Sequence, residues 1–352
     1  MIKGEISNIF KVAFLYMATV IGAGFASGQE IIQFFSKYYN GGFYGALLTG
    51  VLFSIIGYAI LDRVYSERIK SYDEFLFPMM GYFLGRIMEF IVMLFMSCVL
   101  SVMVAGLGSI LMELTGIEYR YCVVISAIVC LLAIMTNIKG IVAVSSFLSP
   151  FLVVGILFVG IYMIVTKDTS VFSLSNKVVR VTNNWVFSSL LYVSYNTILS
   201  TVMLTSVLPY LKTKRVSTWG GILGGGMLCL TVLILNFALY FFYPKSITSE
   251  MPVLSILQNN NQLLGNIYSV ILILAMYTSA ITSGYCLSER IAAKMNINYR
   301  IVAVVMCALV IPMSSMGFSS LIATLYPVFG YLGLFLVFVI LLQFIKCKLT
   351  KA

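Results

Sequence analysis

The segment Gly22-Ala23-Gly24-Phe25-Ala26-Ser27-Gly28-Gln29-Glu30 interrupts an apolar run that begins at Val12 and resumes at Ile31. Each glycine inside a helix costs about 1 kcal/mol relative to alanine, and this segment adds a glutamine and a glutamate to its glycines. In hydrocarbon, a backbone N–H or C=O without a partner costs several kcal/mol unless protein or a wet cavity satisfies it. The sequence therefore predicts a span over about residues 9–35, made of two half-helices joined near mid-membrane.

The composition is that of a polytopic membrane protein. Of 352 residues, 61% are hydrophobic and 10% are charged, whereas soluble proteins average about 25% charged residues. We therefore expect an all-α integral membrane protein with a single transmembrane domain over residues 1–352. Apolar windows long enough to cross a bilayer predict about ten spans, at approximately 9–35, 41–61, 83–112, 120–136, 140–165, 184–209, 217–243, 263–293, 299–316 and 318–345.

The basic residues lie in the short segments between these spans. If the N-terminus is cytoplasmic, 16 of the 22 lysines and arginines lie on the cytoplasmic side, as the positive-inside rule requires. We therefore expect a protein of the cell membrane with both termini in the cytoplasm, surrounded by lipid and without a nucleic-acid or obligate protein partner. Cap-like residues over 246–252 also predict a short external helix before the eighth span.

Two sets of residues recur at nearly equal shifts, 177 and 179 residues, and suggest an internal repeat. Two halves of five spans each, over 9–165 and 184–345, would sit in opposite orientations in the membrane. Glycine matches also arise by coincidence, because small residues let membrane helices approach closely. The matched residues are Gly140, Leu148 and Pro150 with Gly317, Leu325 and Pro327, and Gly41, Gly42 and Gly45 with Gly220, Gly221 and Gly224.

An inverted repeat predicts that the sixth span is broken like the first. The candidate joint is the polar segment Tyr192-Val193-Ser194-Tyr195-Asn196-Thr197, because polar groups in a span are costly unless they face a cavity or a partner helix. Hydrogen bonding between helices is the alternative interpretation.

The eighth span contains a second polar cluster, residues 275–283. The hydroxyls of Thr278 and Ser279, with the carbonyl of Ala275 three residues earlier, would place three oxygen ligands near one point. Neutral oxygen ligands suit sodium better than a soft transition metal. The chain has no histidine, and its seven cysteines show no metal-ligand spacing, so we expect no cofactor beyond a coupling sodium ion.

The segment from Gly22 to Glu30 resembles the first-span signature of YkvI-type amino-acid permeases. Through these permeases, the chain resembles proteins with the LeuT fold of the amino acid-polyamine-organocation superfamily. That fold is a 5+5 inverted repeat with broken helices 1 and 6. The resemblance implies a sodium site made by the carbonyls of Ala18, Ile21 and Ala275 and the hydroxyls of Thr278 and Ser279. Phe25 replaces the asparagine that helps hold a second sodium in some members, so a second site is not expected. The implied substrate site contains Ala23, Gly24, Phe25, Ser27, Ser194, Tyr195, Asn196 and Thr197, with Tyr192 and Tyr277 at its edge.

These features favour a sodium-coupled symporter for a small amino acid or related zwitterion, working by alternating access. A proton-coupled permease and a ligand sensor that keeps the fold without transport are the alternatives. Glu30 would be a proton carrier, a gate or a substrate contact, or it would simply reach the external water layer. An enzyme is not expected, because the sequence shows no cluster of acid, base or metal ligands.

Overall fold

The computed structural model describes residues 3–135, 138–166, 182–242 and 249–349, and it describes side chains in these ranges except at Lys3 and 138–149. The described residues are helical and contain no strand, and each of the ten predicted ranges contains a helix. Lys167, Lys177, Arg180 and Lys245 lie outside the described residues, as do 246–248. Lys139, Gly140 and Leu148 lie where only the backbone is described.

The first span is broken as predicted. Helix α1 (Lys3–Val20) is followed by the four-residue α2 (Ala23–Ala26), the six-residue α3 (Gln29–Phe34) and the 3-10 helix η1 (Ser36–Tyr38). Gly22 is extended, with φ −98° and ψ −173°. Gly28 has φ +87°, in the left-handed region that favours glycine. The two glycines therefore mark the two points at which the chain leaves helical geometry.

Most of the other spans are long helices. Of the described helices, α4, α5, α9, α12, α14 and α8 together with η2 are long and apolar enough to cross a membrane unaided, whereas α6 and α13 are shorter apolar helices. Their bounds are α4 (Asn40–Glu67), α5 (Tyr72–Thr115), α6 (Tyr119–Ile134), α7 (Ile138–Val165), α8 (Trp185–Leu204), η2 (Thr205–Tyr210), α9 (Lys214–Phe241), α11 (Pro252–Asn260), α12 (Gln262–Met295), α13 (Tyr299–Ser314) and α14 (Phe318–Leu349).

Local sequence signals explain where several helices begin and end. The side chains of Ser71, Thr213 and Asn261 each accept a hydrogen bond from a backbone N–H in the first turn of α5, α9 and α12, which satisfies donors that a helix start leaves free. Gly116 ends α5 in the left-handed conformation, and Gly81, with φ +76°, kinks it near its start. The part of α5 beyond Gly81 matches the predicted third span.

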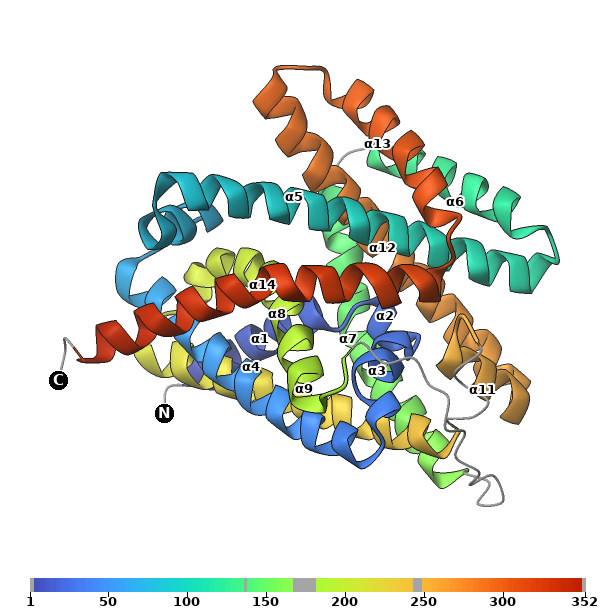
Figure 1. Cartoon of the computed structure of the whole chain (residues 1–352), viewed down its shortest axis with the longest axis horizontal. Coiled ribbons are helices and arrows are strands. Elements are labelled where there is room, and N and C mark those ends of the chain that lie inside the picture. The colour runs from blue at the N-terminus through green and yellow to red at the C-terminus, as the bar shows by residue number, and fades with distance from the viewer. Residues whose placement is uncertain (1–2, 136–137, 167–181, 243–248, 350–352) are drawn as a thin grey trace.

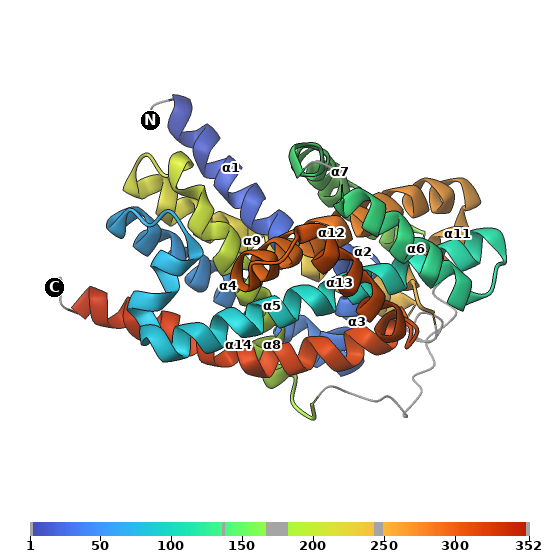
Figure 2. The same cartoon turned by 90° about the horizontal axis from the view of Figure 1, so that it is seen from above.

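The helices form two groups that meet along the first span. Helices α1, α4, α8 and α9 pack together, α5, α6, α12 and α13 form the second group, and α14 lies along α8 and α5 (Figures 1 and 2). The α4–α9 pair is especially close, since a Cβ added at Gly221, one of the matched glycines, would lie 2.5 Å from the Tyr58 backbone nitrogen. The glycine matches thus have a packing role of their own. The inverted repeat over 9–165 and 184–345 stays a prediction.

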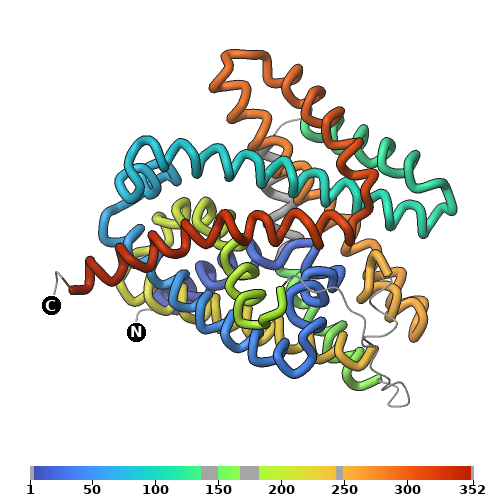
Figure 3. Tube along the Cα trace, in the orientation of Figure 1, coloured from blue at the N-terminus to red at the C-terminus, as the bar shows by residue number. Residues whose placement is uncertain are grey.

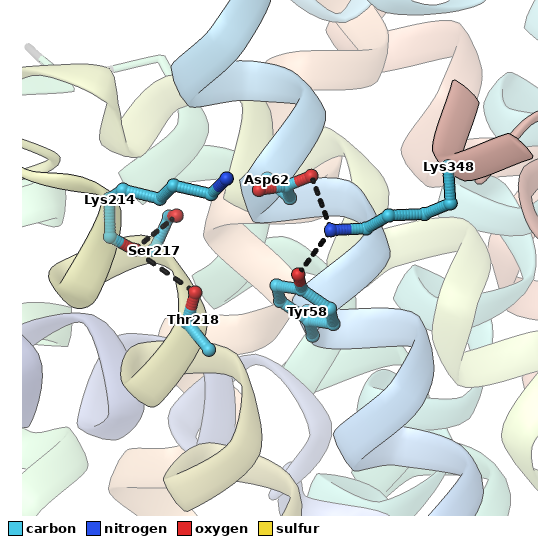
Figure 4. A network of polar contacts seen from close by, with 6 residues as sticks. All are labelled: Tyr58, Asp62, Lys214, Ser217, Thr218 and Lys348. Atoms are coloured by element: carbon cyan, nitrogen blue, oxygen red, sulfur yellow. Dashed lines mark hydrogen bonds and ion pairs between the residues drawn. The ribbon is translucent and has the colours of Figure 1, made fainter. Parts of the chain in front are cut away.

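The two termini lie at one end of the helix bundle and α11 lies toward the other (Figures 1 and 3). This placement agrees with an even number of spans. Near the terminal end, Lys348 at the end of α14 lies 3.9 Å from a carboxylate oxygen of Asp62 and donates to the Tyr58 hydroxyl at 2.8 Å (Figure 4). Both partners belong to α4. Figure 4 also shows the first turn of α9, where the Lys214 carbonyl accepts hydrogen bonds from two side-chain hydroxyls.

The second break predicted at 192–197 is wrong. Helix α8 is continuous from Trp185 to Leu204, and the chain first departs from α-helical geometry at the 3-10 helix η2. Two of the polar side chains bond within the helix. Asn196 Nδ2 donates to the Tyr192 carbonyl at 3.0 Å, and Thr197 Oγ1 donates to the Val193 carbonyl at 2.7 Å. Donation to the carbonyl four residues earlier places polar groups in an intact helix.

Candidate functional site

A cavity of about 900 Å³ lies where the two helix groups meet at the broken first span. Its wall is formed by residues of α1, α2, α3, α5, α7, α8, η2, α12 and α14. The lining follows α1 from the exposed Ser7 and Phe10 to Gly22 and continues to Glu30. The cavity is therefore open at the end of the bundle that holds the termini, and its inner part contains the joint.

At the other end, α11 and α12 cover the joint. The Val253 N–H donates to the Ser27 carbonyl at 3.0 Å, and the Tyr268 hydroxyl donates to the Ala26 carbonyl at 2.7 Å. Gln29 Nε2 donates to the Ser249 carbonyl at 2.6 Å. The short helix predicted before the eighth span is therefore present as α11, and it satisfies backbone groups that the break leaves free.

The residues predicted to bind sodium all line this cavity: Ala18, Ile21, Ala275, Thr278 and Ser279. In a continuous helix the Ala18 carbonyl would accept from the Gly22 N–H, but that N–H donates to the Val20 carbonyl at 3.0 Å. The break thus removes the usual donor of the Ala18 carbonyl. Thr278 Oγ1 lies 3.1 Å from the Ala275 carbonyl. Residues of α1 and α12 that carry carbonyl and hydroxyl oxygens therefore line one cavity, and neutral oxygen ligands of this kind suit a monovalent cation.

The predicted substrate residues divide into two sets. Ala23, Gly24, Tyr195 and Asn196 line the cavity. The others are packed elsewhere: Phe25, Ser27, Tyr192, Ser194 and Thr197 are buried in the bundle, and Tyr277 packs beside the small apolar cluster around Ile134 and Ile281.

Ser27 has a clear structural role at the joint. Its Oγ donates to the Gly24 carbonyl at 2.8 Å and accepts from the Gln29 N–H at 3.3 Å. The Gly28 N–H, which would serve the Gly24 carbonyl in a continuous helix, donates instead to the Phe25 carbonyl at 3.0 Å. The Ser27 hydroxyl therefore replaces a backbone donor that the second break removes.

Glu30 lies in the inner part of the cavity and does not reach the external surface. It lines the cavity and is only 4% exposed. Its Oε2 accepts a hydrogen bond from the Tyr195 hydroxyl at 2.6 Å. Its Oε1 lies so close to Gly24 that an added Cβ there would be 2.3 Å away. The interpretation of Glu30 as a group in the external water layer is therefore wrong, because every residue of α3 is buried.

Two aromatic residues at the site were not predicted. Phe95 of α5 and Tyr326 of α14 line the cavity, and their ring centroids lie 6.1 and 4.9 Å from that of Tyr195. Both lie in apolar runs of the sequence. There, an aromatic residue that lines a cavity cannot be distinguished from one that faces lipid. Thr282 and Ser283 of α12 also line the cavity, and they belong to the polar cluster noted at 275–283.

Comparison with known proteins identifies sequence relatives of this chain and solved structures of similar fold. No protein-family model matches the chain. The sequence is 29% identical over 338 residues to "Uncharacterized membrane protein YkvI" of Bacillus subtilis (strain 168), covering 94% of both chains. It is 27% identical over 335 residues to "Uncharacterized protein YyaD" of the same organism, covering 95% of this chain and 96% of the relative.

Solved structures of the same shape include several transporters. The structure of Mhp1 in an inward-facing conformation matches with TM-score 0.61 and 14% identity, over 92% of this chain and 73% of the other. The Eremococcus coleocola manganese transporter matches with TM-score 0.57 and 15% identity, over 96% and 78%. A Na⁺-coupled sialic acid symporter matches with TM-score 0.54 and 13% identity, over 92% and 75%.

The broken first span, the cavity at its joint and these likenesses define the chain as an integral membrane protein of the LeuT fold. Within that class, its sequence similarity runs along nearly its whole length to the Bacillus subtilis membrane protein YkvI. The resemblance seen in the first-span segment is thereby confirmed. The expectation that the chain is not an enzyme agrees with this class of fold.

Proposed function

We propose that the protein is a secondary active transporter that moves a small molecule across the cell membrane by alternating access, as a sodium-coupled symporter of an amino acid or related zwitterion. The observation that carries this proposal is the cavity of about 900 Å³, which is open at one end of the bundle, closed at the other and centred on a broken span. Broken spans place helix ends and free backbone groups at binding sites in transporters.

The closed end is suited to opening. Val253 of α11 and Tyr268 of α12 each donate one hydrogen bond to the joint. Gln29 of the first span donates two to the segment before α11. A movement between the two helix groups that breaks such bonds would open this end. With cytoplasmic termini, the present conformation would face the cytoplasm.

The sodium proposal rests on the oxygen groups of α1 and α12 that share the cavity. Bound sodium would link the two helix groups and favour one of their arrangements. Because equilibrium coupling is reciprocal, substrate and sodium would each tighten binding of the other by the same factor. The substrate carboxylate would lie near the backbone of Ala23 and Gly24, which lines the same space.

Uptake into liposomes tests the proposal directly. Labelled amino acids should accumulate when a sodium gradient is imposed and not when potassium replaces sodium. Thr278→Ala and Ser279→Ala should lower sodium-driven uptake, whereas Ser269→Ala, a buried serine of α12 that does not line the cavity, should leave it unchanged. Uptake that does not depend on the sodium gradient would contradict sodium coupling. Ligand binding without uptake would favour the ligand sensor that keeps the fold without transport.

A proton-coupled permease is the second candidate, and the position of Glu30 favours it. A carboxylate that is 4% exposed and borders the cavity is placed as intramembrane proton carriers are. Uptake driven by a pH gradient alone, and lost in Glu30→Gln, would replace sodium coupling with proton coupling.

A further inference from the structure

We propose that Glu30, with the rings of Phe95, Tyr195 and Tyr326, forms a recognition site for the ammonium group of the transported substrate. This inference rests on the proposed transport function and specifies its substrate class. The substrate would carry an organic ammonium group, primary or methylated, with or without a carboxylate.

The charge balance of the cavity carries the first step. Among the described residues that line it, Glu30 is the only aspartate or glutamate and Lys11 is the only lysine or arginine. Lys11 is exposed on α1, 11 residues before Gly22, which corresponds to about 16 Å along a helix. None of the ion pairs in the described part of the chain includes Glu30. A carboxylate buried at this depth calls for a cationic partner or a proton.

The surroundings of Glu30 differ from those of Glu89, a second buried glutamate. Glu89 is 7% exposed and pairs with Lys294 at 2.8 Å and Arg86 at 3.0 Å. Two cations of the protein therefore neutralise Glu89. Glu30 has a neutral hydroxyl of Tyr195 as its hydrogen-bond donor, so its counter-charge is left to something that enters the cavity.

The aromatic rings select which cation enters. Phe95, Tyr195 and Tyr326 all line the cavity beside Glu30. The Tyr195 and Tyr326 centroids are 4.9 Å apart, and the Phe95 centroid lies 6.1 Å from both. Aromatic faces attract an organic ammonium and tolerate its methyl groups, whereas a small hydrated metal ion prefers a cage of oxygens. A carboxylate beside three rings therefore favours an amine.

Gly24 leaves the second carboxylate oxygen within reach of a ligand. Tyr195 occupies Oε2, and Oε1 lies against Gly24, which itself lines the cavity. A substrate whose ammonium meets Oε1 would hold its other end toward the joint at Ala23. The geometry thus assigns the ammonium to a side chain and leaves the carboxylate, where there is one, to the backbone.

The experiment compares ligands that differ only in charge. Purified protein is titrated, by ligand-induced thermal shift and by competition with labelled substrate, with sets made of an amino acid, its decarboxylated amine and its deaminated carboxylate. The amino acid and the amine should bind and the carboxylate should not. In Glu30→Gln, affinity for the amine should fall about 30-fold or more, equivalent to about 2 kcal/mol, while Glu30→Asp retains part of it.

Matched variants separate recognition from folding and from proton transport. Tyr326→Leu should weaken amine binding more than Tyr326→Phe, and each variant must keep the ligand-free melting temperature of the wild type to count. If Glu30→Gln binds amines as the wild type does, the inference is overturned. Substrate exchange without a gradient that survives in Glu30→Gln, with loss only of pH-driven uptake, also overturns it in favour of a proton carrier. If no ligand binds the wild type and none is taken up, the proposed function itself fails.

Discussion

The first span and α8 both place polar residues in the middle of the bundle, but only the first span loses its helix there. In the first span, Gly22 is extended and Gly28 has φ +87°. In α8, residues 192–197 remain helical, and the side chains of Asn196 and Thr197 donate to carbonyls of the preceding turn. The comparison shows that a polar side chain does not by itself open a helix in a membrane.

The difference lies in where the backbone partners come from. Glycine lacks a side chain that can shield or satisfy its backbone, so the joint takes its partners from Ser27, Val253 and Tyr268. In α8, by contrast, the side chains of Asn196 and Thr197 bond within their own helix. A break therefore needs glycines and also external donors, and these donors are placed by elements more than 200 residues away in sequence.

Gly28→Ala should produce the largest loss of stability. The left-handed conformation costs a non-glycine residue about 1–2 kcal/mol, and the new methyl would lie 2.8 Å from a Val253 side-chain carbon, which adds about 1–3 kcal/mol of overpacking. A marked fall in melting temperature in detergent is expected. Gly226→Ala, a position of α9 with nothing within 4 Å, is the control and should be neutral or stabilising. Equal melting temperatures for the two variants would contradict the role of the positive φ.

Gly24→Ala should act mainly on the ligand site. A methyl group 2.3 Å from Glu30 Oε1 must displace the carboxylate and disturb its bond to Tyr195, at about 1–3 kcal/mol. Substrate affinity, measured by ligand-induced thermal shift, should fall at least about tenfold, for about 1.4 kcal/mol. Gly22→Ala has room for its methyl group and should bind substrate better than Gly24→Ala does. The reverse order would show that Glu30 is not held against Gly24.

Ser27→Ala should cost about 1–2 kcal/mol, because two backbone groups of the joint lose their side-chain partner. The matched control is Ser206→Ala. Ser206 also donates to a carbonyl three residues earlier, at 2.7 Å, but it is exposed, so water replaces the lost bond. Melting temperatures of the two variants in the same detergent check the prediction, and a smaller loss for Ser27→Ala than for Ser206→Ala would refute it.

The fold could be predicted from the sequence because the hydropathy of a short stretch of residues is enough to identify a membrane span. Hydropathy located the ten helical ranges, and the glycines at Gly22 and Gly28 located the broken span. The break in the sixth span was predicted wrongly, because the sequence shows which residues are polar but not where they donate. Asn196 and Thr197 bond within α8, and nothing in their spacing separates that outcome from a joint.

The candidate site was predictable only where backbone chemistry or charge marked it. Gly24, Glu30 and the oxygen groups of α1 and α12 stand out from their apolar surroundings, and all line the cavity. Phe95 and Tyr326 do not stand out, since 14% of the residues of this chain are aromatic. Their approach to Tyr195 depends on how α5 and α14 pack against α8, which is a tertiary property.

Thr197→Val should have the smallest effect on stability. It tests the difference between α8 and the first span most directly. Like Ser27, Thr197 donates its hydroxyl to a backbone carbonyl, at 2.7 Å. The Val193 carbonyl lies within a continuous helix and keeps its backbone donor, whereas the Gly24 carbonyl has lost its own. Replacing the hydroxyl with a methyl of similar shape should therefore cost less than about 1 kcal/mol. A fall in melting temperature as large as that of Ser27→Ala would show that α8, too, depends on side chains for its backbone hydrogen bonds.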